Sequence, residues 1–211
     1  MIKKVNSYFV SPENDFQDIA LMFNNAEKCQ IDQLLWSNSG YFPGVEFNIA
    51  YTTDAILLKY FVKEKYAVAR HTEVNDLVYK DSCVEFFLSF NNGRSYYNLE
   101  FNCIGTPYCA YGMDRHNRVE LPVDVVKQIV LLNDIKKVEK QDYTEWEIAL
   151  LIPFKVFVHD HITSLKGCEC KANFYKCGEE TPEPHYLSWN NIINSEPDFH
   201  LPQFFGTINF V

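Results

Sequence analysis

The stretch from Val78 to Thr106 constrains the fold more than any other part of the sequence. Two short segments within it, 84–90 and 96–103, alternate apolar and polar residues with a period of two. This alternation is typical of β-strands with one buried face. Between them, residues 91–95 (Asn-Asn-Gly-Arg-Ser) tolerate the positive φ angles of a tight turn. The stretch therefore predicts an antiparallel β-hairpin.

The same alternation predicts how the two strands pair, because a one-residue slip would move a whole apolar set to the wrong face. The pairs expected on the core face are Val84–Cys103, Phe86–Phe101, Leu88–Leu99 and Phe90–Tyr97. On the other face, Glu85 is expected opposite Asn102, and Phe87 opposite Glu100. Carboxylates and amides bond in fixed directions, which suits a hydroxyl-rich ligand. The alternative is a solvated outer face, which antiparallel sheets commonly have.

Short strand patterns recur along the rest of the chain. They cover Tyr8–Val10 as an edge strand, Ile31–Trp36, 47–51, Ile56–Val62, Tyr66–His71, 129–132, 135–138, Tyr143–Ile152, Cys170–Cys177 and Phe205–Phe210. Residues 107–118 are expected to be loop. Helical patterns are confined to Asp15–Ala26, Pro122–Ile129 and a turn over 153–158. These elements predict one all-β domain over residues 1–211, an antiparallel β-sandwich or jelly roll with a few short helices.

The charge balance limits the possible partners. The formal net charge is −9 and no basic stripe is present, which argues against nucleic acid and anionic membranes as partners. A neutral ligand such as a sugar is compatible with this charge. The sequence shows no signal peptide and no membrane span. With seven cysteines, it favours a reducing cytoplasm. It does not predict the oligomeric state.

Two groups of residues invite a metal interpretation. Cys168, Cys170 and Cys177 lie close in sequence, but their spacing is not a usual zinc spacing, and buried inert thiols are the alternative. His159 and His161 would share one side of a strand, yet no third ligand is near them and a solvated loop is the alternative. The sequence therefore leaves metal binding undetermined.

Two other features bear on function. Glu85 and Glu100 could serve as acid and base for glycoside cleavage, which requires two carboxylates at a set separation. Trp189 lies in a polar, turn-rich tail and could either fill the core or stack on a sugar ring. No nucleotide-binding loop and no nucleophile elbow is present.

Several motifs together resemble family 9 carbohydrate-binding modules, and more closely the stand-alone bacterial proteins described as family 9-like. They are the strings DSCVEFF (81–87), LEFN (99–102), ANFY (172–175), LSW (187–189) and FFGTINF (204–210). The resemblance extends from about Val45 to Val211, and the first 40 residues match only the closer group. It implies a β-sandwich of the jelly-roll or DOMON kind that binds glycans. It also implies association with glycoside hydrolases and, in some members, structural calcium.

The resemblance also implies which residues bind the ligand. Trp189 falls on one of two tryptophan positions that clamp a sugar, and Tyr79 lies near the other. Glu100 takes the place of a family arginine, and Tyr175 lies near a family amide.

We therefore predict a non-catalytic carbohydrate-binding protein. Trp189 is expected to stack on the sugar, with Tyr79 and Tyr175 as secondary aromatic residues. Glu100, Asn102 and Arg70 are expected as polar contacts. One alternative is a protein-interaction scaffold without a sugar site, in which Trp189 would be buried. Another is a glycoside hydrolase that uses Glu85 and Glu100.

Overall fold

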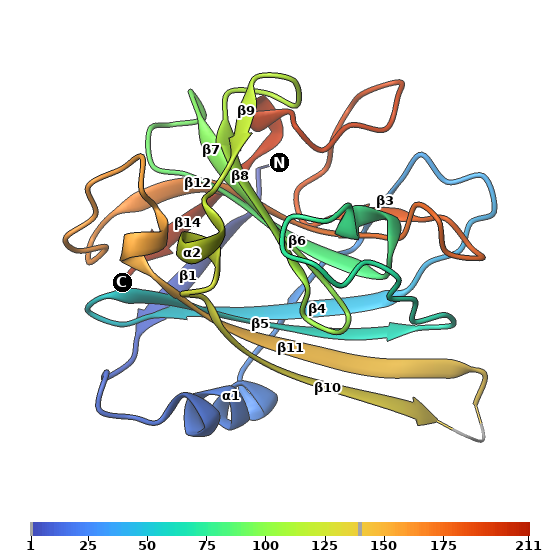
Figure 1. The fold of residues 1–211 in the computed structure, drawn as a ribbon, viewed down its shortest axis with the longest axis horizontal. Coiled ribbons are helices and arrows are strands. Elements are labelled where there is room, and N and C mark those ends of the chain that lie inside the picture. The colour runs from blue at the N-terminus through green and yellow to red at the C-terminus, as the bar shows by residue number, and fades with distance from the viewer. Residues whose placement is uncertain (1, 139–140) are drawn as a thin grey trace.

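The computed structural model describes residues 2–138 and 141–211. In these residues, fourteen strands form one curled sheet, accompanied by two short α-helices and three 3₁₀ turns (Figure 1). The helices are α1 (Phe16–Asn25) and α2 (Val123–Val126), and the turns are Val78–Lys80, Phe154–Val156 and Pro202–Phe204. The strands are β1 (Lys4–Phe9), β2 (Cys29–Gln30), β3 (Gln33–Leu35), β4 (Gly44–Tyr51), β5 (Ala55–Glu64), β6 (Cys83–Ser89), β7 (Tyr96–Asn102), β8 (Pro107–Gly112), β9 (Arg118–Glu120), β10 (Val130–Val138), β11 (Tyr143–Pro153), β12 (Glu169–Cys177), β13 (Tyr186–Ser188) and β14 (Gly206–Phe210).

The sheet has two halves, which β1 joins. One half has the order β10-β11-β5-β4, and the other has the order β14-β12-β6-β7-β8-β9. The first part of β1 pairs in parallel with β14, and Tyr8 and Phe9 pair in parallel with β4. Tyr8 and Phe9 lie in a strand, as predicted, and pair with β4 alone, but the strand also extends back to Lys4, where its partner is β14. The prediction of a mostly β fold is confirmed.

The main core lies between the two halves. Phe47 of β4 stacks on Phe174 of β12 at a centroid distance of 3.8 Å, and Phe174 stacks on Phe86 at 5.0 Å. The Tyr60 hydroxyl, from β5, donates a hydrogen bond of 2.7 Å to the backbone oxygen of Glu85 on β6. The hairpin's apolar face is buried in this core, as the alternation predicts. Burying these rings is the main stabilising contribution to such a fold.

Helix α1 covers the outer face of the β4–β5 half (Figure 1). Its residues Ile19 and Phe23 pack against Ala50 and Leu57, as the helical spacing predicts. The side chain of Asp15 accepts a hydrogen bond of 2.8 Å from the backbone nitrogen of Gln17 and so caps the first turn. No helix in the described part of the chain is long and apolar enough to cross a membrane.

The predicted hairpin forms, but its pairing differs from the prediction by two residues. Glu85 pairs with Glu100, and Leu88 pairs with Tyr97. The reason is a longer loop, in which Ser89 Oγ accepts from the backbone nitrogen of Gly93 at 2.8 Å. A shift of two keeps every side chain on its predicted face. The consequence is that two glutamates, rather than a glutamate and an amide, lie directly opposite each other.

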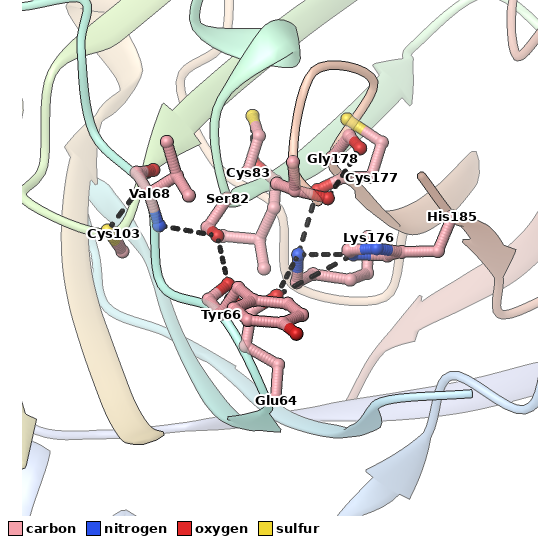
Figure 2. Close-up of polar contacts among 12 residues, drawn as sticks. Glu64, Tyr66, Val68, Ser82, Cys83, Cys103, Lys176, Cys177, Gly178 and His185 are labelled. Atoms are coloured by element: carbon pink, nitrogen blue, oxygen red, sulfur yellow. Dashed lines mark hydrogen bonds and ion pairs between the residues drawn. The ribbon is translucent and has the colours of Figure 1, made fainter. Parts of the chain in front are cut away.

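Three segments differ from the predicted elements. Tyr66–His71 is not a strand, because its polar groups bond to Ser82 instead of to a neighbouring strand. Ser82 Oγ accepts from the Val68 nitrogen and donates to the Tyr66 oxygen, each at 2.9 Å (Figure 2). Residues 107–112 form β8 rather than loop, and the two weak strand patterns after residue 129 form one continuous strand, β10.

Candidate functional site

The outer face of β6, β7 and β12, opposite the main core, carries a cavity of about 230 Å³. Glu85, Glu100 and Cys177 come from these three strands and lie in its wall. The segments around Trp36 and residues 197–200 also line the cavity. We call this feature the Glu85–Glu100 cavity. The predicted polar face of the hairpin is therefore not solvated. Phe87 and Tyr96 belong to a second buried cluster, and Glu85 and Glu100 line the cavity.

Two buried glutamates lie opposite each other in the cavity wall. Glu85 is 3% exposed and Glu100 is 2% exposed, and adjacent strands hold directly opposed side chains roughly 5 Å apart. Burial raises the pKa of Glu100 to about 7, although the nearby Arg118 guanidinium opposes this rise. Burial also raises the pKa of Glu85 well above its ordinary value, and Cys177 and Glu100 add to the rise. Near neutral pH the pair therefore retains protons that exposed carboxyls would lose.

Only one of the two carboxyl oxygens of Glu100 is engaged by the protein. Oε1 accepts a hydrogen bond of 2.8 Å from Asn98 Nδ2 and lies 3.7 Å from Arg118 Nη1. Oε2 is buried and has no hydrogen-bond partner among residues 2–138 and 141–211. A buried acceptor without a partner costs free energy, and native proteins nearly always satisfy one by protein, water or ligand. Oε2 is therefore a contact available to a ligand.

Arg118 is held in place by several neighbours. Its Nη1 donates to His200 Nε2 at 3.0 Å, and its guanidinium carbon lies 5.2 Å from the centre of the Tyr108 ring. Because arginine can only donate, Nε2 of His200 accepts, and Nδ1 donates to the Tyr96 hydroxyl at 2.8 Å. Burial and Arg118 lower the pKa of His200 to about 2, so this imidazole is neutral. The cation thus has a fixed position beside Glu100.

Aromatic rings form another part of the cavity lining. Trp36 packs edge-on against Tyr186 and at a tilt against Phe199, with a centroid distance of 5.8 Å in each pair. Its indole nitrogen donates to the backbone oxygen of Asn194 at 2.8 Å. Its φ angle is +45°, a strained conformation for a bulky residue and one that concentrates at functional sites. Trp36, Tyr79 and Tyr186 are only half-buried, so parts of their rings remain available. An exposed aromatic face can stack on the C–H face of a sugar.

Two of the six predicted ligand residues, Tyr79 and Glu100, line the cavity together. Asn102 and Arg70 do not line it. Asn102 is buried and donates to Asp81 Oδ2 at 2.9 Å, so it secures a loop. Arg70 is exposed and pairs with Glu180 at 3.8 Å.

Tyr175 lies one layer beneath the cavity. Its ring is fully buried and stacks on Phe199 at 4.2 Å, and its hydroxyl donates to the Phe199 backbone oxygen at 3.1 Å. Tyr175 therefore supports a lining residue instead of facing the ligand.

Trp189, the predicted stacking residue, lies in the main core. It is 3% exposed and packs edge-on against Phe47 at 6.0 Å and Phe174 at 5.5 Å. A Cβ atom on Gly206 would come within 2.3 Å of Trp189 Cζ3, so the glycine makes room for this ring. This placement corrects the expectation, because a ring on the core side of the sheet cannot reach the cavity. Burial of Trp189 is what the scaffold alternative predicts.

Several lining residues were missed from the sequence. Trp36 had a usable signal, since it is one of only three tryptophans and is followed by a polar loop. Arg118, Tyr186 and His200 had none, because they lie in short or irregular segments far from the hairpin. Only the folded chain brings them beside Glu100.

One group of potential metal ligands is present in the described residues. Cys83, Glu85 and Cys177 offer ligand atoms that all lie within 4.8 Å of one another. This set contains two thiols, whereas calcium prefers six to eight oxygen ligands. The set therefore does not fit the structural calcium that the family resemblance implies. His159, from the other suspected motif, stacks on Tyr111 at 4.2 Å.

Comparison with known proteins gives a consistent result. A family model described as "Carbohydrate-binding family 9" matches residues 15–210. A proposed carbohydrate-binding protein from Bacteroides uniformis ATCC 8492 has a similar solved structure, with 33% identity, a TM-score of 0.89 and 100% of both chains covered. No curated protein matches the chain.

Two solved structures of a family 9 carbohydrate-binding module from Caldicellulosiruptor kristjanssonii are similar in fold, at 14% identity. The complex with glucose covers 99% of this chain and 96% of that one, with a TM-score of 0.61. The complex with cellotriose covers 99% and 93%, with a TM-score of 0.62.

Proposed function

The chain belongs to carbohydrate-binding family 9, and we propose that it binds its carbohydrate in the Glu85–Glu100 cavity without cleaving it. One observation carries this placement. Glu100 Oε2 is buried in the cavity wall with no partner in the described part of the chain. A sugar hydroxyl can donate the missing hydrogen bond, and Arg118 can donate to a neighbouring sugar oxygen.

The chemistry of the cavity favours a neutral sugar. The lining carries charges of both signs, since Arg115 and Arg118 lie with Glu100, Glu179 and Asp198, and burial raises the pKa of Glu85. Half-buried aromatic rings next to these groups provide apolar surface for a sugar face. The related module binds glucose and cellotriose, which are neutral sugars.

The volume favours a small ligand portion. At about 230 Å³ the cavity is smaller than the roughly 300–1,000 Å³ typical of sites for drug-sized ligands. We therefore propose that it holds a monosaccharide or the end of a chain, with the rest of an oligosaccharide outside.

The arrangement of the glutamates argues against the hydrolase alternative. In glycosidases the two carboxyl groups flank the scissile bond. Glu85 and Glu100 are neighbours in one wall, on adjacent strands, so they approach a ligand from the same side. This geometry suits binding better than cleavage.

We extend the proposal to two finer points. The facing halves of the curled sheet would correspond to a β-sandwich of the jelly-roll or DOMON kind, as the family resemblance implies. The protein would act together with glycoside hydrolases in carbohydrate breakdown. Both points are supported by the resemblance of the sequence motifs.

The test of sugar binding uses the full chain, titrated with glucose and cello-oligosaccharides by calorimetry and by tryptophan fluorescence. Trp36 lines the cavity, while Trp146 and Trp189 are buried in the core, so a fluorescence change reports on the cavity. We expect Glu100→Gln to weaken binding by on the order of 10- to 100-fold, the range for losing a hydrogen bond to a charged group.

Glu120→Gln is the matched control. Glu120 is an exposed glutamate on β9, two residues from Arg118, and does not line the cavity. Its substitution should leave the affinity unchanged. Equal affinity in wild type and Glu100→Gln would place the sugar elsewhere on the protein. If none of the sugars tested gives a heat of binding in calorimetry, the result would support the scaffold alternative.

A further inference from the structure

Beside the proposed sugar contacts, two thiols and a carboxyl group converge in the cavity wall. Cys83 of β6 and Cys177 of β12 are directly paired in the sheet, and Glu85 lies two residues along β6 on the same face. Both sulfur atoms point to the side of the strands opposite the Lys176 ammonium (Figure 2). All three side chains are at most 3% exposed.

The three groups already contact one another. Cys177 Sγ donates to Glu85 Oε1 at 3.0 Å, and its ligand atom and those of Cys83 and Glu85 lie within 4.8 Å of one another. Ligands around a tetrahedral ion with bond lengths of about 2.0–2.3 Å are separated by roughly 3–4 Å. Only small side-chain movements are therefore needed to place an ion between them.

We propose that Cys83, Glu85 and Cys177 form a binding site for a thiophilic divalent cation, with Zn²⁺ as the best match. Thiolate ligands select zinc over calcium and magnesium, and zinc accepts mixed sulfur and carboxylate ligands. Three protein ligands leave a fourth tetrahedral position. Glu85 and Cys177 line the cavity, so this position opens toward it and can hold water.

Binding exchanges protons for the metal ion. In the metal-free protein both cysteines are free, and Cys177 Sγ donates its proton to Glu85 Oε1. The incoming Zn²⁺ displaces the two thiol protons, and any proton on Glu85, to the buffer, and two sulfur–zinc bonds form with no change in oxidation state. Affinity should therefore rise with pH.

The metal site lies in the wall of the same cavity as the proposed sugar site, but the two can be tested separately. Its sulfur ligands are not the groups that we assign to the sugar, and free Cys177 already bonds to Glu85 without any ligand. Sugar titrations on the same variants separate the two proposals, since either can fail alone.

The test uses the full chain, reduced and freed of metal by a chelator that is then removed. Titration with Cd²⁺ should give one equivalent of bound ion with a thiolate-to-cadmium charge-transfer band in the ultraviolet. Zn²⁺ should displace the cadmium. Cys83→Ser and Cys177→Ser should each abolish the band or weaken binding by on the order of 100-fold or more, since even loss of an outer contact costs 10- to 100-fold. Cys168→Ser, at an exposed thiol outside the cluster, should change nothing.

Further measurements keep the test decisive if a serine variant fails to fold. Glu85→Gln retains both thiols, so it should keep the band but bind cadmium more weakly. The absence of a band in wild type with all seven thiols titratable would overturn the proposal. A count of five thiols in wild type before reduction, against six in Cys83→Ser, would instead identify a Cys83–Cys177 disulfide and also overturn the proposal. A band with wild-type intensity and wild-type affinity in Cys83→Ser and in Cys177→Ser would also overturn the proposal.

Discussion

The two faces of strand β12 bury ionisable groups for different purposes. Lys176 points into the core between the sheet halves, while its neighbour Cys177 lines the cavity on the outer face. Each face also carries a buried glutamate beside a cation, Glu64 with Lys176 inside and Glu100 with Arg118 outside. The difference lies in how completely the protein engages the glutamate.

The inner cluster is closed. Glu64 Oε1 accepts from Trp146 Nε1 at 2.6 Å. Its Oε2 has no hydrogen-bond partner in the described residues but forms an ion pair with Lys176 Nζ at 3.0 Å. Lys176 Nζ also donates to His185 Nε2 at 2.7 Å and to the Cys177 oxygen at 2.8 Å (Figure 2). These side chains are at most 2% exposed, and their contacts are all internal. Such a cluster serves the fold.

The outer cluster is open. Glu100 is equally buried, but its cation lies 3.7 Å away and its Oε2 has no partner in the residues described. Burial alone therefore does not distinguish a structural glutamate from a binding one. What distinguishes the binding glutamate is an unfilled hydrogen-bonding position next to a cavity.

The largest effect is expected from Trp189→Ala on the inner face. Removing a buried tryptophan should lower the free energy of unfolding by about 3–5 kcal/mol, because a cavity remains against Gly206 and Phe174. Urea denaturation measures this loss. Trp36→Ala, on the outer face, is the matched variant and should weaken sugar binding while changing stability much less. The reverse outcome would contradict the assignment of the two faces.

A smaller loss, roughly 3 kcal/mol, is expected for Lys176→Met. The methionine fills most of the space but leaves Glu64 buried without its cation. The double variant Glu64→Gln/Lys176→Met removes both charges and should be more stable than the single variant, as a double-mutant cycle by urea denaturation would show. Additive losses would mean that the ion pair is not coupled.

Much of the fold could be predicted from local pattern. The period-two alternation in 84–90 and 96–103 predicted the strands and their faces correctly, because burial of one face acts on every second residue. It could not fix the register to within two residues. The loop length depends on hydrogen bonds such as that of Ser89 Oγ, which leave no mark on the alternation.

The site was less predictable. Tyr79 and Glu100 were found because they lie on or next to the hairpin. Trp189 was misplaced, since a motif position does not reveal which side of the sheet the ring occupies. The thiol cluster was missed because Cys83 and Cys177 are 94 positions apart in sequence, and only strand pairing makes them neighbours. A local sequence pattern carries no information on which distant strands pair with each other.

The most discriminating effect, and the one with the smallest change per step of the measurement, is the pH dependence of stability, where the two faces should show opposite signs. The pKa of Glu100 is raised to about 7 from 4.5, so its contribution to the free energy of unfolding is present at low pH and is lost as pH rises from about 4.5 to 7. Burial and Lys176 lower the pKa of His185 to about 3 from 6.5, so its contribution is lost as pH falls from about 6.5 to 3. Each slope can reach at most about 1.4 kcal/mol per pH unit.

The measurement is urea denaturation of wild type, Glu100→Gln and His185→Gln at a series of pH values. Subtracting the free energy of unfolding of each variant from that of wild type gives the pH dependence due to each residue. The wild-type advantage over Glu100→Gln should shrink as pH rises, and its advantage over His185→Gln should shrink as pH falls. Difference curves of the same sign would mean that the two clusters are not distinct. Opposite signs are expected because burial disfavours the charged form of both groups. It favours loss of the proton from His185, where the Lys176 ammonium adds to the effect, and it favours retention of the proton on Glu100.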